Sequence, residues 1–298
     1  MIARSDMRIK QPIKQHWKIF YGVVGVLILM SIYSYLSYRQ HIINPTDTTM
    51  PNVKQLIDGV RLVTTPRENS LQAAFGVAEE LPENFLHRFW VQAWKTMIVQ
   101  DVWATYSRLG KGLVWGCVIS VVLGTLMGCY EWLASFLLPT LSFLSKVPGT
   151  AMLAVFFVLA GTGETMFIAM IGFGILPTLT QAVYMSARDD LHHEEIDKAY
   201  TLGAKNIELI WEVVFPQILP KVLDNIRLQF GPAMVYLIAA EMLVGQVGMG
   251  YQIRMQQRLL HMNVVYDYIL VLGFTGLLMD KGMLLFRQWW CPWFDRDK

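Results

Sequence analysis

Few side chains in this sequence have the types and spacing of a catalytic or metal-binding centre. The run His192-His193-Glu194-Glu195 has the composition of a metal cluster, but adjacent side chains on a helix point in different directions and no second cluster accompanies it. Gly110-Lys111 resembles the end of a phosphate-binding loop, yet it lacks the upstream glycine and leads into an apolar segment. The three cysteines, Cys117, Cys129 and Cys291, are too few and too far apart for a metal site or a disulfide framework. We therefore expect no covalent chemistry and no cofactor bound by this chain.

The composition is that of a chain that crosses a membrane several times. Of the 298 residues, 54% are hydrophobic and 16% are charged, whereas soluble domains carry about 25% charged residues. The mean hydropathy is +0.38. A net charge of +2 with scattered basic residues gives no support for nucleic-acid binding. We expect an all-α polytopic membrane protein in contact with membrane lipid.

Six apolar segments predict about six transmembrane helices, at residues 19–38, 112–130, 150–161, 164–187, 222–244 and 264–286. Segment 132–145 is short and contains Pro139, so we expect it to lie at the interface or to re-enter the membrane. Basic residues exceed acidic ones before the first segment, which places the N-terminus in the cytoplasm. Six crossings return the C-terminus to that side. Between the first two segments, apolar residues from Val53 to Val63 recur at helical spacing and predict a short amphipathic helix outside the membrane.

A row of small residues runs along the second apolar segment. Gly112, Gly116, Ser120, Gly124 and Gly128 recur every four residues and therefore share one helix face. Such rows let two helix backbones approach closely in lipid. We interpret this row as a packing surface.

A polar island at residues 197–220 interrupts the apolar segments. We expect a helix from Glu194 to Leu202, a turn with positive φ at Gly203, and a second helix from Asn206 to Val214 that ends at Pro216. Residues 188–221 contain four basic and seven acidic residues, against the positive-inside rule. An amphipathic loop that lies on lipid favours Lys and Arg. The acidic composition therefore favours docking to a soluble protein.

The island resembles the cytoplasmic coupling loop of ABC importer permeases, which has Glu-Ala-Ala, three residues, Gly, nine residues, Ile, one residue and Leu-Pro. The corresponding residues here are Asp197-Lys198-Ala199, Gly203, Val213 and Phe215-Pro216. Further stretches in the same order are similar to the nitrate, sulfonate, taurine and bicarbonate importer group. These are 101–108, Gly112, 124–128, Pro139, Lys146-Val-Pro148, Phe156-Phe157, 161–164, 240–243 and 248–251, so that the resemblance spans about residues 101–286.

This resemblance implies a type I ABC importer transmembrane domain with a cytoplasmic coupling helix. It implies a second permease copy, cytoplasmic ATPases that bind ATP and Mg, and an extracytoplasmic substrate-binding protein. The residues that it assigns to ATPase coupling are Glu194, Glu195, Asp197, Ala199, Tyr200, Gly203, Ala204, Ile207 and Pro216. The expected organisation is a cytoplasmic tail 1–18, the first transmembrane helix 19–38, an external segment 39–100, a permease core 101–288 with its coupling loop at 189–220, and a cytoplasmic tail 289–298.

Four other residues are candidates for roles in transport. Glu241 lies near the outer end of an apolar segment, where an ionisable group needs a partner or water. It is either a path or gate residue or a structural carboxylate, and Pro148 is a second candidate for the path. Arg254 and Arg258 are expected in an external loop, where they either dock the binding protein and attract an anion or form a solvated face.

We therefore expect a permease subunit of a bacterial inner-membrane importer, acting as a homodimer on a small anionic solute such as nitrate, a sulfonate or bicarbonate. The main alternative is a secondary transporter driven by an ion gradient, which often shows internal repeats and deep carboxylates. A membrane-embedded enzyme would need clustered His and Asp residues, and the six histidines are dispersed.

Overall fold

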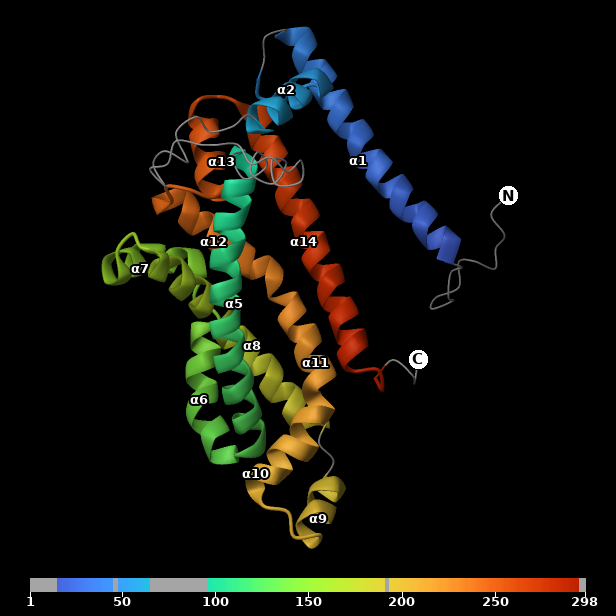
Figure 1. Cartoon of the computed structure of the whole chain (residues 1–298), viewed down its shortest axis with the longest axis vertical. Coiled ribbons are helices and arrows are strands. Elements are labelled where there is room, and N and C mark those ends of the chain that lie inside the picture. Colours follow the sequence, from blue (N-terminus) through green and yellow to red (C-terminus); the bar gives the residue numbers. More distant parts are fainter. Residues whose placement is uncertain (1–14, 45–47, 65–95, 191–192, 295–298) are drawn as a thin grey trace, which may run out of the picture.

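The computed structural model describes residues 15–44, 48–64, 96–190 and 193–294, and these residues form an elongated bundle of helices (Figure 1). The structure does not describe the basic residues Arg4, Arg8, Lys10 and Lys14, the stretch 65–95 or His192. The helices are α1 Gln15–Ile43, α2 Val53–Thr64, α5 Met97–Cys129, α6 Glu131–Leu144, α7 Leu153–Ala160, α8 Glu164–Asp190, α9 His193–Thr201, α10 Asn206–Glu208, α11 Phe215–Leu228, α12 Phe230–Val244, α13 Met249–Arg258 and α14 Met262–Trp290. A 3-10 segment, Gly149–Met152, precedes α7, and a π-helical segment, Leu209–Val214, joins α10 to α11.

Five helical stretches of the described chain are long and apolar enough to cross a membrane, and the count becomes six if the bent pair α6–α7 forms one crossing. The two arms of this pair, Glu131–Leu144 and Gly149–Ala160, meet at an angle of 83°. The expectation of about six transmembrane helices is confirmed in this form. The predicted separate span 150–161 is instead the second arm of the pair, because α7 has only eight residues and would rise about 12 Å. Pro139 lies inside the continuous helix α6.

The centre of the bundle is the contact between α5 and α8, which run parallel. A Cβ atom on Gly112 would lie 2.7 Å from Ile171, one on Gly116 2.5 Å from Ile175, and one on Gly124 2.7 Å from Val183. Each step along α5 is matched by the same step along α8, so the two helices stay in register. The prediction that the small-residue row is a packing surface is confirmed.

The remaining elements are arranged around this pair. α12 completes an apolar cluster with α5 and α8 that contains Leu109, Ile171 and Leu237. α2 packs across the start of α14, where Asn263 donates a hydrogen bond to the carbonyl of Gln55 at 3.3 Å. The predicted amphipathic helix is thus present, and it lies at the end of the bundle opposite to α9 and α10 (Figure 1).

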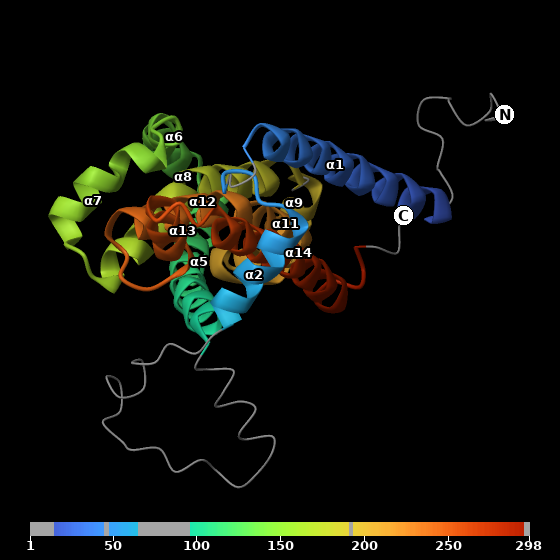
Figure 2. The same ribbon diagram turned by 90° about the horizontal axis from the view of Figure 1, so that it is seen from above.

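α1 contains the predicted first span and joins the rest of the molecule through its last turns. Tyr33 donates a hydrogen bond to the Pro51 carbonyl at 2.8 Å, and Ser37 donates to the Met50 carbonyl at 3.0 Å. Seen from above, α1 and α7 extend to opposite sides of the bundle (Figure 2). The apolar side chains of α1 are largely exposed, as expected for a helix that faces lipid or another chain.

Candidate functional site

The predicted coupling loop forms a tight corner between α9 and α10. Gly203 has φ of +88°, a left-handed conformation that costs glycine little. The amide of Ala204 donates to the Ala199 carbonyl at 3.1 Å, and the amide of Gly203 donates to the Tyr200 carbonyl at 3.0 Å. These two bonds make a Schellman motif, which satisfies carbonyls that the end of α9 leaves free. The prediction of a positive-φ turn at Gly203 is confirmed.

Hydrogen bonds fix the two sides of the corner to each other. The Lys205 amide donates to the Glu208 carboxylate at 2.9 Å at the start of α10, and the Tyr200 hydroxyl donates to the Asn206 side-chain oxygen at 3.1 Å. The side-chain amide of Gln217 donates to the Glu195 carboxylate at 2.6 Å and so connects α9 to α11. α9 is therefore hydrogen-bonded both to the start of α10 and to α11.

The inner face of the corner packs against the ends of the long helices. Ile196 and Ala199 contact an apolar cluster to which α8 contributes Val183 and the π segment contributes Leu209 and Val214. Leu209 and Val214 are buried. The cluster therefore connects α9 with the end of α8 and with the π-helical segment that leads into α11.

The outer face of the corner is apolar and acidic. Leu202 is 88% exposed, whereas Ile207 (71% exposed) and Trp211 (62% exposed) line an apolar cavity of about 560 Å³ together with residues of α5. The predicted coupling residues lie as follows: Glu195, Asp197, Tyr200 and Gly203 are exposed, Ala199, Ala204 and Pro216 are half-buried, Ile207 is exposed, and Glu194 lies in α9 without a described side chain. Exposed Glu208 and Glu212 lie on the same segment. Such a face suits a protein groove with an apolar floor and a basic rim.

One prediction for this loop is wrong: Pro216 does not end a helix at Val214. The chain stays helical from Asn206 through Leu228, and Pro216 lies in the first turn of α11. The π-helical segment Leu209–Val214 directly precedes it, and the Phe215 amide bonds the carbonyl of Ile210. The wider π turn makes room for the proline ring and accommodates the missing amide proton. The second arm of the corner is thus continuous with a membrane-crossing helix.

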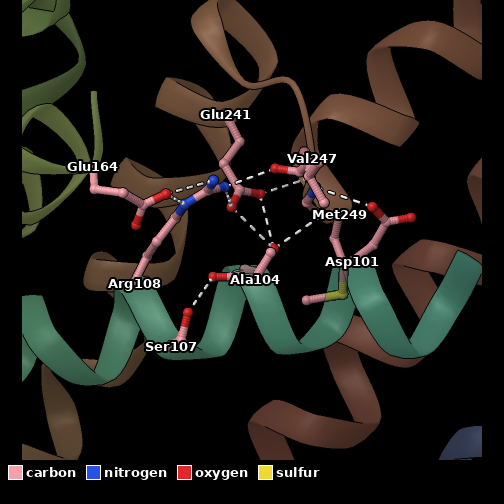
Figure 3. Close-up of polar contacts among 11 residues, drawn as sticks. Asp101, Ala104, Ser107, Arg108, Glu164, Glu241, Val247 and Met249 are labelled. Atoms are coloured by element: carbon pink, nitrogen blue, oxygen red, sulfur yellow. Dashed lines mark hydrogen bonds and ion pairs between the residues drawn. The ribbon is translucent and has the colours of Figure 1, made fainter. Parts of the chain in front are cut away.

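A second site, which the sequence did not predict as such, is a buried ion-pair network at the other end of the bundle (Figure 3). Arg108 of α5 lies between two carboxylates: its Nη1 is 2.8 Å from Glu241 of α12, and its Nη2 is 2.8 Å from Glu164 of α8. Arg108 also donates to the Val247 carbonyl at 2.7 Å and lies over the ring of Phe167. Glu241 is fully buried, whereas the side chain of Glu164 is 52% exposed.

The loop after α12 folds over this network. The Gly250 amide donates to Glu241 at 3.0 Å, and the Met249 amide donates to the Thr105 hydroxyl at 2.9 Å. Thr105 in turn donates to Glu241. Gly248 has φ of +129°, and a Cβ there would lie 2.5 Å from the Glu241 carboxylate. Glycine is therefore required where the loop approaches the carboxylate.

Asp101 extends the network toward α14. It accepts hydrogen bonds from the Gly248 amide at 3.0 Å and from the Tyr268 hydroxyl at 2.8 Å, and it is fully buried. Asp101, Thr105 and Arg108 are spaced by four and three residues, so they share one face of α5. That spacing of polar residues was the available signal in the sequence. It did not identify Glu241, Glu164 or the loop as their partners.

The structure bears on the other candidate residues as follows. Glu241 is enclosed by partners, which is the geometry of the structural carboxylate and not of a group facing an aqueous path in this conformation. Arg254 donates to the carbonyls of Met242 and, at 2.6 Å, of Leu243, so it caps the end of α12. Arg258 and Pro148 are exposed, and Pro148 lies at the bend between α6 and α7.

Nothing in the described ranges forms a metal site, since no three His, Cys, Asp or Glu side chains there converge. Cys291 is buried beside the end of α14, and burial raises the pKa of its thiol. This environment suits a small apolar filler and not a reactive thiolate.

Comparison with known proteins identifies the family. The model of the binding-protein-dependent transport system inner membrane component matches residues 118–289, more than half of the chain. The chain belongs to this family of ABC importer permeases. The taurine transport system permease protein TauC of Escherichia coli is 25% identical over 194 residues, which cover 65% of this chain and 70% of TauC. The nitrate import permease protein NrtB of Synechocystis is 22% identical over 182 residues, which cover 61% of this chain and 66% of NrtB.

A solved structure shows the same fold. A chain of the inward-facing MetNI methionine ABC transporter superposes with a TM-score of 0.57 and 19% identity, covering 64% of this permease and 95% of that chain. The permease is therefore an all-α, multi-pass inner-membrane protein with the type I importer architecture, and its family is a membrane component that is not itself catalytic.

Proposed function

We propose that this permease forms the translocation path of an ATP-driven importer for a small anionic solute. In this proposal two copies of the chain assemble with two cytoplasmic ATPases, which bind ATP and Mg, and an extracytoplasmic binding protein delivers the solute. The N- and C-termini and the α9–α10 corner face the cytoplasm. A sulfonate or nitrate is the favoured class of solute, since TauC and NrtB carry those names.

The observation that carries the proposal is the construction of the α9–α10 corner. Leu202 is exposed on its outer face beside acidic side chains, while Ile196 and Ala199 on its inner face pack on the ends of the membrane-crossing helices. A soluble partner that binds the outer face moves the inner face with it. An ATPase that closes on ATP can in this way change which side of the membrane the path opens to.

The test is reconstitution of the purified permease with its ATPase and binding protein in proteoliposomes, with labelled taurine and nitrate as probes. We expect uptake of one of these two solutes that requires ATP and stops when ATP is replaced by a non-hydrolysable analogue. Uptake that continues without ATP under an imposed proton or sodium gradient would contradict the proposal and favour a secondary transporter.

A further inference from the structure

The helix break between α6 and α7 lies deep in the membrane-crossing part of the bundle. α6 begins beside the lower end of α5 and rises for 14 residues, which corresponds to about 21 Å. After the break, Gly149 contacts the ring of Tyr236 of α12, and that ring also contacts Gly174 of α8. Gly174 is the eleventh residue of the 27-residue helix α8, which places it about 15 Å from that helix's start. Both measures place the break near the middle of the bilayer.

Irregular backbone at this depth is tolerated only where protein buries it or where it lines a water-filled cavity. Residues Ser145–Pro148 of the break are not helical. They include Lys146, whose side chain is exposed. Across the described ranges, the side chain of Lys146 makes no hydrogen bond or ion pair. In contrast, Arg227 and Arg287 on membrane-crossing helices pair with Asp280 and Asp224.

An unpaired ammonium at mid-depth cannot face hydrocarbon without a large cost. The flexible stem of a lysine reaches about 6 Å, which is too short to bring the charge from this depth to a headgroup. In the assembled permease the exposed face at Lys146 must therefore meet water or a polar group, and not hydrocarbon.

Tyr236 is positioned at the same break. A Cβ on Gly149 would lie 2.6 Å from the Tyr236 ring and one on Gly174 would lie 2.1 Å from it, so two glycines on different elements make room for this ring. The ring is half-buried, and its hydroxyl has no hydrogen-bond partner in the part of the chain that the structure describes. A tyrosine ring that is fixed by packing, and whose hydroxyl makes no hydrogen bond within the described chain, can orient a polar solute by donating a hydrogen bond to it.

We propose that Lys146 and the Tyr236 hydroxyl form an anion-contact site in the middle of the translocation path. Lys146 supplies the positive charge that compensates a solute such as a sulfonate or nitrate when it loses water, and Tyr236 donates a hydrogen bond to one of its oxygens. The pair makes the path selective for anions in addition to the choice that the binding protein makes. This inference rests on the proposed function and names residues that determine its specificity.

The test measures charge at this site without using transport. In the assembled permease–ATPase complex with Cys117, Cys129 and Cys291 replaced by Ser, Tyr236→Cys is treated with an anionic and a cationic methanethiosulfonate at low salt. We expect faster modification by the anionic reagent, and loss of that preference when Lys146→Gln is added. For a unit charge within a Debye length of the thiol, we expect the ratio to change about threefold or more. Lys146→Arg is the matched control and keeps the preference.

Two results would overturn the inference. One is a thiol at position 236 that neither reagent modifies, and the other is a rate ratio that Lys146→Gln leaves unchanged. Co-purification of the ATPase is measured in parallel for the native permease and for each variant. A native permease that binds no ATPase contradicts the proposed importer function. An unreactive thiol in a complex that retains its ATPase contradicts only the anion-contact site.

Discussion

Arg108 and Glu241 are 133 residues apart in the sequence, and their charged groups meet at 2.8 Å inside the bundle. The carboxylate is fully buried and accepts further hydrogen bonds from Thr105 and the Gly250 amide. The pair therefore connects α5, α12 and the loop that follows α12. Buried pairs of this kind gain little over apolar packing, but the loss of one partner leaves an uncompensated charge.

Arg108→Met should destabilise the permease by about 3–5 kcal/mol, because Glu241 is then buried without its cation. Glu164→Gln is the matched control: its side chain is 52% exposed, and an exposed ion pair contributes about 1 kcal/mol or less. The measurement is thermal unfolding of the purified permease in detergent. Equal stability of the two variants would show that the network is not a structural centre.

The α5–α8 contact should be sensitive to a single methyl group. A Cβ on Gly124 would lie 2.8 Å from the Thr180 backbone carbonyl, which cannot rotate away, whereas a Cβ on Gly110 meets nothing within 4 Å. We expect Gly124→Ala to cost about 1–3 kcal/mol and Gly110→Ala to be neutral or stabilising by about 1 kcal/mol. Because both glycines lie in α5, the comparison of the two variants separates the effect of packing on stability from the effect of helix propensity. The readout is the unfolding temperature, and two similar shifts would contradict the close contact.

The corner at Gly203 should tolerate asparagine better than valine. Open space surrounds Gly203, so the constraint is its φ of +88° and not a steric contact with a neighbour. A β-branched residue in this conformation costs about 1–3 kcal/mol, whereas asparagine adopts it readily. We expect Gly203→Val to reduce uptake per ATP hydrolysed in proteoliposomes, and Gly203→Asn to retain it. Normal coupling in the valine variant would argue against a rigid lever at this corner.

The exposed apolar side chain at the α9–α10 corner should determine ATPase binding without affecting the stability of the permease. Leu202 is 88% exposed, and Leu259 at the opposite end of the bundle is 57% exposed. If the ATPase covers the α9–α10 corner, Leu202→Ser should weaken its binding about tenfold or more, as for a central interface residue, while Leu259→Ser should not. The measurement is the dissociation constant of the ATPase from the detergent-solubilised permease. An ATPase that binds both variants like the native chain would place the docking surface elsewhere.

The sequence by itself determined the class of this protein and much of its local geometry. A crossing helix needs enough apolar residues to span the bilayer, so the apolar segments predicted the crossing helices, except that 150–161 is one arm of the bent pair α6–α7. The four-residue spacing from Gly112 to Gly128 predicted a close helix contact, and Gly203 predicted a turn, because both follow from local steric rules.

Only the tertiary structure decided which distant groups meet. The sequence did not show that Arg108 pairs with Glu241 and Glu164, or that Arg254 caps α12, since these contacts depend on how separate helices pack. Pro216 was predicted to end a helix, because local rules do not include the π turn that the packed core at Leu209 and Val214 maintains. The sequence Lys146-Val147-Pro148-Gly149 indicates a break in the helix. The position of this break within the membrane-crossing part of the bundle follows only from the contacts of Tyr236 with Gly149 and Gly174. Local steric effects act along the chain, whereas burial and charge pairing act across it, and for this reason they become visible only in the folded bundle.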